Sequence, residues 1–141
     1  MKWKPQLNAA ENAYLALPRL AEEYFEAGRK AASHNRTPRQ LHRFRIKTKH
    51  FRYSLELFRP LFGRRLDPQI RRLQEVQRIL GKMSDRHTIG VLIEENPALA
   101  RKLEHSAKAR AKEFRKYWKD TFDAPHQRRA WKARLAATPP S

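Results

Sequence analysis

Four side chains that carry or can acquire positive charge recur at every third or fourth residue over one short stretch. They are His42, Arg45, Lys49 and Arg52. Because an α-helix has 3.6 residues per turn, this spacing places all four on one face of a helix. Arg presents a planar fork of N–H donors that fits phosphate oxygens, Lys a compact charge, and protonated His two ring donors. This basic stripe therefore suits a ligand that presents a row of anionic groups.

Apolar residues flank the basic stripe on both sides, which predicts a groove and not a solvent-facing surface. On one side runs a seam of core positions: Leu41, Phe44, Thr48, Phe51, Leu55, Phe58 and Phe62. On the other side lie Ile46, Tyr53 and Leu57. A solvated face normally lies opposite the core, so we expect the cations to line a groove in which a polyanion offsets their repulsion. The alternative is that they pair with acids such as Glu56, Glu75 or Asp85.

A following segment offers a candidate for the opposite wall of this groove. Its polar residues, at three- or four-residue steps, are Arg71, Gln74, Arg78, Lys82 and Asp85, beside a mostly apolar face. We expect the first four to contact the ligand and Asp85 to orient a neighbouring base. The alternative is that these bases are ordinary surface decoration.

The elements that position these residues are predicted to be helices throughout. Ala, Leu, Glu, Arg and Lys dominate, and Thr37-Pro38-Arg39-Gln40 is typical of a helix start with a capping Thr. We expect helices near 7–32, 38–59, 68–82, 84–95 and 97–122, with a kink or break at Pro18. Short connections favour antiparallel neighbours, which predicts an all-α, antiparallel bundle of four to five helices over residues 1–123. Residues 124–141 are predicted to be a basic, weakly ordered tail.

The overall charge indicates an anionic partner. The chain has 32 Lys and Arg against 14 Asp and Glu, and a net charge of +18 exceeds what solubility requires. Nucleic acid is the alternative partner, because aromatic residues could stack on bases; Trp131 in the basic tail is the best placed. The N-terminus has no apolar signal region and no run is long enough to cross a bilayer, so we expect a cytoplasmic protein that does not act on membranes.

The sequence shows neither a metal-ligand pattern nor an activated nucleophile that catalysis on phosphate compounds would need. There is no cysteine, the four glycines are isolated, and the six histidines show no metal-ligand spacing. We therefore expect a binding protein, not an enzyme, with no cofactor and no metal.

Two motifs resemble the CHAD domain family. The pattern His-x-x-Arg-x-x-x-Lys-x-x-Arg-Tyr runs from His42 to Tyr53, and Leu-Gln-x-x-x-x-x-Leu-Gly-x-x-x-Asp runs from Leu73 to Asp85. The resemblance covers roughly residues 10–95. It implies an all-α fold of helical repeats with a basic groove that binds inorganic polyphosphate, and often targeting to polyphosphate granules.

The resemblance also assigns residues. The basic stripe matches the family's first motif, and Arg71 and Gln74 fall at the start of the second. The family commonly has two repeats and this chain shows one, so a homodimer could complete the groove across a two-fold axis. We expect binding to weaken with salt and to strengthen as pH falls through about 6.5, where imidazoles gain a proton.

Overall fold

The computed structural model describes residues 4–6, 8–33, 36–81 and 96–135, and within these every regular element is a helix. The helices are α1 (Ala9–Ala31), α2 (Pro38–Phe62), α3 (Asp67–Gly81), α5 (Pro97–Tyr117) and α6 (Pro125–Arg134). A 3₁₀ turn, Gly63–Leu66, joins α2 to α3, and a π-helical segment, Trp118–Phe122, follows α5. The all-α prediction is confirmed. The helix expected over 84–95 lies outside the described residues.

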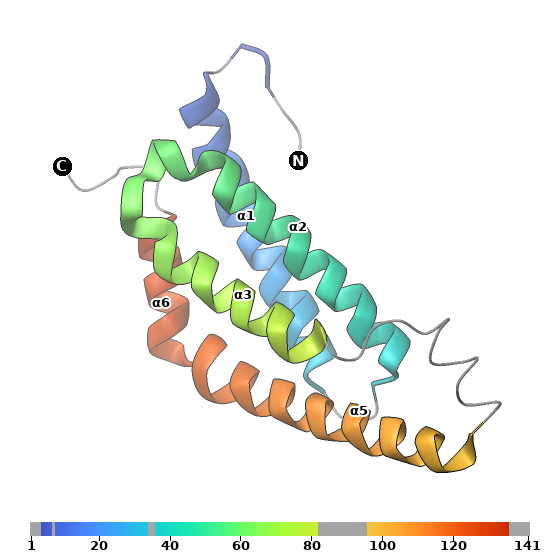
Figure 1. Ribbon diagram of the computed structural model, residues 1–141. Coiled ribbons are helices and arrows are strands. Elements are labelled where there is room, and N and C mark those ends of the chain that lie inside the picture. The colour runs from blue at the N-terminus through green and yellow to red at the C-terminus, as the bar shows by residue number, and fades with distance from the viewer. Residues whose placement is uncertain (1–3, 7, 34–35, 82–95, 136–141) are drawn as a thin grey trace.

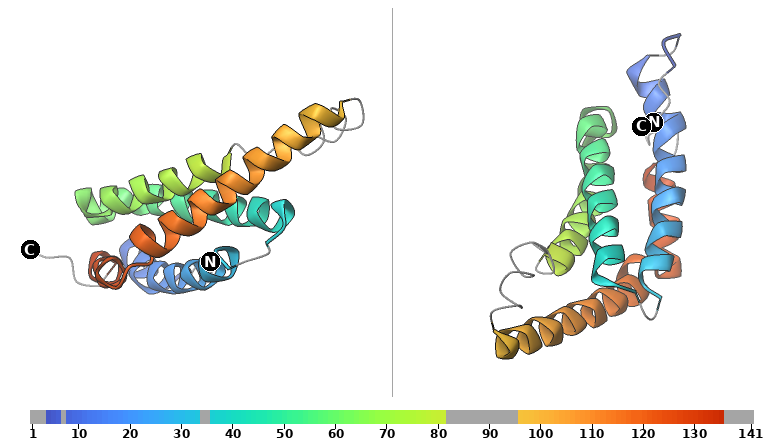
Figure 2. Two further views of the ribbon diagram at one scale, coloured as in Figure 1. Left: turned by 90° about the horizontal axis from the view of Figure 1, so that it is seen from below. Right: turned by 90° about the vertical axis from the view of Figure 1, so that its right-hand side faces the viewer.

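Neighbouring helices along the first half of the chain run antiparallel (Figure 1). α2 packs against α1 on one side and against α3 on the other. α5 crosses α3, and its N-terminal half extends beyond the other helices (Figure 2). α1 continues through Pro18 without a break in the helix.

The local sequence explains where α2 begins and ends. Thr37 Oγ1 accepts a hydrogen bond from the Gln40 amide at 3.1 Å, and Gln40 Oε1 accepts one from the Thr37 amide at 2.9 Å. This reciprocal cap satisfies two amides that the first turn leaves without helical partners. The helix runs three residues past the expected end at Arg59, because Phe62 continues the buried seam. It stops at Gly63, whose φ of 62° favours glycine.

The seam predicted for α2 forms the centre of the core. Its seven residues, Leu41, Phe44, Thr48, Phe51, Leu55, Phe58 and Phe62, are all buried. Thr48 is satisfied there because its hydroxyl donates to the Phe44 carbonyl at 2.9 Å and accepts from the Tyr24 hydroxyl at 2.9 Å. Burial of Tyr24 raises the pKa of its phenol well above the ordinary value, although the Thr48 hydrogen bond opposes the shift.

Aromatic rings from the C-terminal part of the chain complete the core. Trp118, Phe122 and Trp131 all lie among rings of α1 and α2. The six-membered ring of Trp118 lies directly against Gly28 of α1, where a β-carbon would overlap it. Gly28 is therefore required by a close approach between α1 and the segment that follows α5.

The prediction of a weakly ordered tail is wrong over residues 125–135. Pro125–Arg134 form α6, and the side chains of Trp131 and Leu135 are each 1% exposed. Trp131 packs 5.4–5.7 Å, between ring centroids, from Phe25, Phe51 and Phe122. Because the indole is buried, the expectation that it could stack on nucleic-acid bases is also wrong. Residues 136–141 lie outside the described part of the chain.

Candidate polyanion-binding site

Arg45 reaches from the basic stripe across to the end of α3. A side-chain carbon on Gly81 would lie 3.5 Å from both Nε and Nη2 of Arg45, so the guanidinium lies against the backbone at that glycine. The side chain is partly buried, and its Nε has no hydrogen-bond partner among the described residues. Packing of α2 on α3 thus holds one positive charge in place at the contact between the two helices.

Tyr53 connects the other two cations of the stripe. Its ring centroid lies 5.7 Å from Lys49 Nζ and 5.1 Å from Arg52 Cζ. Both distances fall within the range of cation–π attraction, in which the electron-rich face of the ring favours a positive charge. Tyr53 therefore helps to hold Lys49 and Arg52 beside one another although their charges repel. This role was missed at the level of sequence, where Tyr53 counted only as an apolar residue.

The alternative of pairing with carboxylates holds in part for one of these cations, whose Nε forms an ion-pair contact but no hydrogen bond within the described structure. Arg52 Nε lies 3.4 Å from a carboxylate oxygen of Glu56, one helical turn later. Among the described residues, neither Arg45 nor Lys49 forms an ion pair with an acid. Glu75, considered as another partner, is engaged elsewhere, and Asp85 lies outside the described residues.

The second apolar flank of the stripe differs from expectation. Ile46 is 41%, Tyr53 46% and Leu57 70% exposed, so no described helix covers them. Sequence periodicity shows that these residues share a face of α2, but the neighbours of that face are set by how α1 and α3 pack. The stripe is thus bounded by packed helix on the α3 side only. Three cavities of the described part, of about 680, 570 and 310 Å³, lie between α1 and α6 or between α1 and α2, and the stripe lines none of the three.

The four residues predicted on α3 do not form one continuous wall. Arg71 and Gln74 are exposed, and Gln74 lies two turns before Gly81, on the same side of α3. Arg78 is directed to α5: its Nη2 lies 2.7 Å from Glu75 and 3.3 Å from Glu113. The Arg78 hydrogen bond lowers the pKa of Glu75, and the same bond raises the pKa of Arg78. Lys82 lies outside the described residues.

A salt bridge that fixes α2 against the start of α3 was also missed. Arg59 donates two hydrogen bonds to the Asp67 carboxylate, at 2.6 and 3.0 Å. These bonds hold the pKa of Asp67 below its usual value. The Asp67-Pro68 helix-start signal was visible in the sequence, but nothing in it identified Arg59 as the partner.

His42 completes the stripe at the first turns of α2 and is partly buried. The model of the CHAD domain family matches residues 2–94, which include α1, α2, α3 and the whole stripe. The chain belongs to the CHAD domain family. As a family, CHAD domains are associated with polyphosphate-related proteins. No curated protein and no solved structure matches the chain.

Two further properties bear on what this CHAD domain can do. Within the described ranges, no three His, Asp or Glu side chains come together in a way that could hold a metal ion. In the same part of the chain, none of the helices combines the length and the hydropathy of a membrane span.

Proposed function

We propose that this CHAD domain binds inorganic polyphosphate through the basic stripe of α2 and the adjoining end of α3. The observation that carries the proposal is that Arg45 and Lys49 lack carboxylate partners in the described structure. The two positive charges lie about one helical turn apart. Like charges at such spacing destabilise a helix, and a bound polyanion removes that cost. Membership of the CHAD family supports the same ligand.

The chemistry of the stripe suits a polymer recognised by charge alone. Polyphosphate bears about one negative charge per phosphate and has no base edges. Arg45, held against Gly81, is pre-oriented, so its remaining N–H groups lose little freedom when a phosphate oxygen accepts from them. Lys49 and Arg52, both close to the ring of Tyr53, supply the next charges along α2. His42 adds a further donor when it is protonated.

Nucleic acid is the second candidate, and one observation favours it. The ring of Tyr53 is 46% exposed and lies near two cations, and an exposed ring can stack on a base while neighbouring cations contact phosphates. Competition between long polyphosphate and single-stranded RNA, at equal phosphate concentration, distinguishes the two ligands. We expect polyphosphate to displace RNA, and preferential retention of RNA would favour the second candidate.

The domain acts as a binding module and not as an enzyme, in the cytoplasm and on polyphosphate granules. Two copies placed with their stripes face to face would enclose one polyphosphate chain between them. Light scattering in the presence and absence of polyphosphate tests this dimer, and a mass of one chain under both conditions would reject it.

The decisive experiment compares two variants that lose the same charge from the same helix. The stripe variant is Arg45→Ala/Lys49→Ala/Arg52→Ala; the control is Arg39→Ala/Arg43→Ala/Lys47→Ala, whose residues are exposed on another side of α2. At roughly 0.5–1 kcal/mol per lost contact, the stripe variant should bind polyphosphate about 10- to 100-fold more weakly. The control should change much less. Equal losses in both variants would show that overall charge, and not the stripe, governs binding.

A further inference from the structure

A second row of basic side chains runs along α5 and into the π-helical segment that follows it, outside the part of the chain that matches the family. We call it the α5 ridge; its members recur at three- or four-residue steps and all are exposed. They are Arg101, His105, Lys108, Lys112, Lys116 and Lys119. At 1.5 Å per residue, the row is about 27 Å long.

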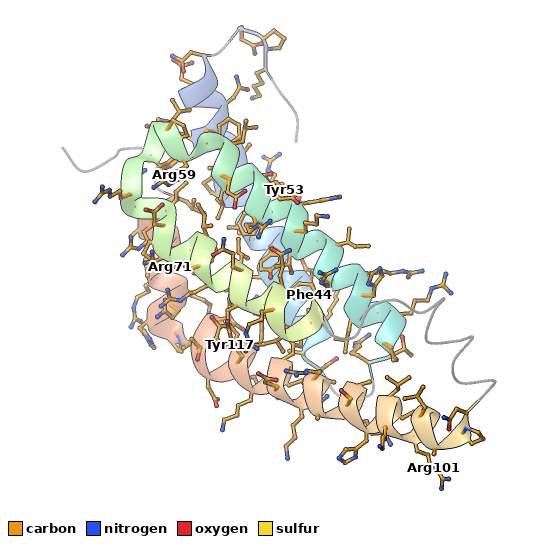
Figure 3. All side chains as sticks on the ribbon, viewed as in Figure 1. Phe44, Tyr53, Arg59, Arg71, Arg101 and Tyr117 are labelled. Atoms are coloured by element: carbon orange, nitrogen blue, oxygen red, sulfur yellow. The ribbon has the colours of Figure 1, made fainter. Side chains whose placement is uncertain are left out.

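The α5 ridge faces away from the helical bundle. The opposite side of α5 packs on the core through Phe114, with Ala107 and Ala111 partly buried beside it. In Figure 3, Tyr117 points toward α3 and Arg101 points away from the bundle. The ridge therefore takes no part in packing α5 on the core, because the contacts that hold α5 in place come from its other side.

None of the six side chains of the ridge forms an ion pair with a carboxylate of the described residues. Glu113, the acid of α5 that does pair, is occupied by Arg78 and Arg110 at 3.3 and 3.1 Å. A row of uncompensated charges on one helix face repels itself, so it favours a ligand that supplies anions along the same line.

The composition of the ridge restricts the kind of ligand. It contains no Phe, Tyr or Trp side chain that could stack on a base and no large apolar side chain that could enter a bilayer. Lys, a point charge without directional preference, supplies four of the six members. Such a surface recognises a linear polyanion by charge density alone.

We propose that the α5 ridge is a second polyphosphate-binding surface, which makes the chain bivalent and able to cross-link polyphosphate molecules. The inference rests on the proposed function, because the basic stripe of α2 is the other surface. α3 lies between α2 and α5, so the two surfaces belong to different faces of the molecule. A protein molecule with two such surfaces can bind two long polyphosphate molecules at once, so many protein molecules join them into a network. Short polyphosphate molecules only saturate each surface separately.

The test compares four proteins in two measurements with polyphosphate, and in binding assays with anionic vesicles and duplex DNA. Besides the wild type, these are the stripe variant, a ridge variant (Lys108→Ala/Lys112→Ala/Lys116→Ala/Lys119→Ala) and a dispersed control (Arg19→Ala/Arg36→Ala/Arg64→Ala/Lys132→Ala). All eight substituted residues of the last two variants are exposed, and both variants lose four charges. Calorimetric titration with short polyphosphate gives the number of binding sites, and light scattering with long polyphosphate reports condensation.

We expect two sites for the wild type and for the dispersed control, and one site for the ridge variant. The ridge variant should need about tenfold more protein than the control to reach half-maximal scattering, since avidity depends on both surfaces. Equal scattering and equal site numbers for ridge variant and control would overturn the ridge proposal. So would a ridge variant that loses binding only to anionic vesicles or to duplex DNA. If the stripe variant keeps both sites and condenses polyphosphate as the wild type does, the proposed function fails instead.

Discussion

Replacement of Trp131 by alanine tests whether α6 is part of the folded core. The indole is 1% exposed and packs against rings of α1, α2 and the π-helical segment. Alanine would leave a cavity between three aromatic side chains that belong to well-packed helices and cannot easily collapse into it. The cost therefore has two parts, the lost transfer of the indole from water and the cavity.

The size of the effect can be set out in advance. Truncation of a buried Trp to Ala costs about 3–5 kcal/mol. Unfolding entropy near 2.1 cal/mol/K per residue gives roughly 0.3 kcal/mol per degree for a chain of 141 residues. The midpoint of thermal unfolding should thus fall by about 10–17 °C.

Circular dichroism at 222 nm, followed during heating, measures this shift. Lys132→Ala is the matched control, because it alters the next residue of α6 and its side chain is exposed. The control should change stability by no more than about 0.5 kcal/mol. A midpoint for Trp131→Ala within 2–3 °C of that control would correspond to a loss of about 1 kcal/mol or less. That result would show that α6 does not pack on the core in solution.

Three other outcomes follow from the structure. Gly28→Ala should lower the free energy of unfolding by about 1–3 kcal/mol in urea titration, because the added carbon overlaps the Trp118 ring; an unchanged midpoint would contradict that contact. Since burial raises the pKa of Tyr24, the folded state keeps a proton that the unfolded chain releases, so stability should fall as pH rises above about 10. Urea midpoints between pH 9 and pH 11 should decline less for Tyr24→Phe than for the wild type. Equal declines in the two proteins would show that Tyr24 is not the cause of the loss of stability. Polyphosphate affinity should drop steeply between 50 and 200 mM salt, with a shallower slope for the stripe variant; equal slopes would mean that the stripe releases no counterions on binding.

Local signals in the sequence predicted most of the helices. The Thr37–Gln40 cap, the proline at the first helical position and the seven-residue seam were enough to place α2 and to identify its buried face. The reason is that capping and periodicity depend only on residues within a few positions of each other. α3 and α5 were predicted for the same reason.

Tertiary contacts decide the features that the sequence did not reveal. α6 and its C-cap together have only two bulky apolar residues, Trp131 and Leu135, so the segment shows no helical period and becomes ordered through rings far away in the chain. Arg78 turns to Glu113, a residue 35 positions later, and no local pattern indicates that choice. Likewise, periodicity placed Ile46 and Leu57 on one face of α2 but could not show that this face stays exposed.

The close contact between Gly28 and Trp118 decides how far a shortened form of the chain must extend. The family match ends at residue 94, yet the ring that fills the hollow beside Gly28 comes from beyond that limit. A fragment cut there would expose Tyr24 and Phe25 to water on the side that Trp118 and Phe122 now cover. Exposed aromatic surface of this kind promotes self-association. The smallest piece that keeps its interior closed therefore extends to Leu135, about forty residues past the recognised boundary.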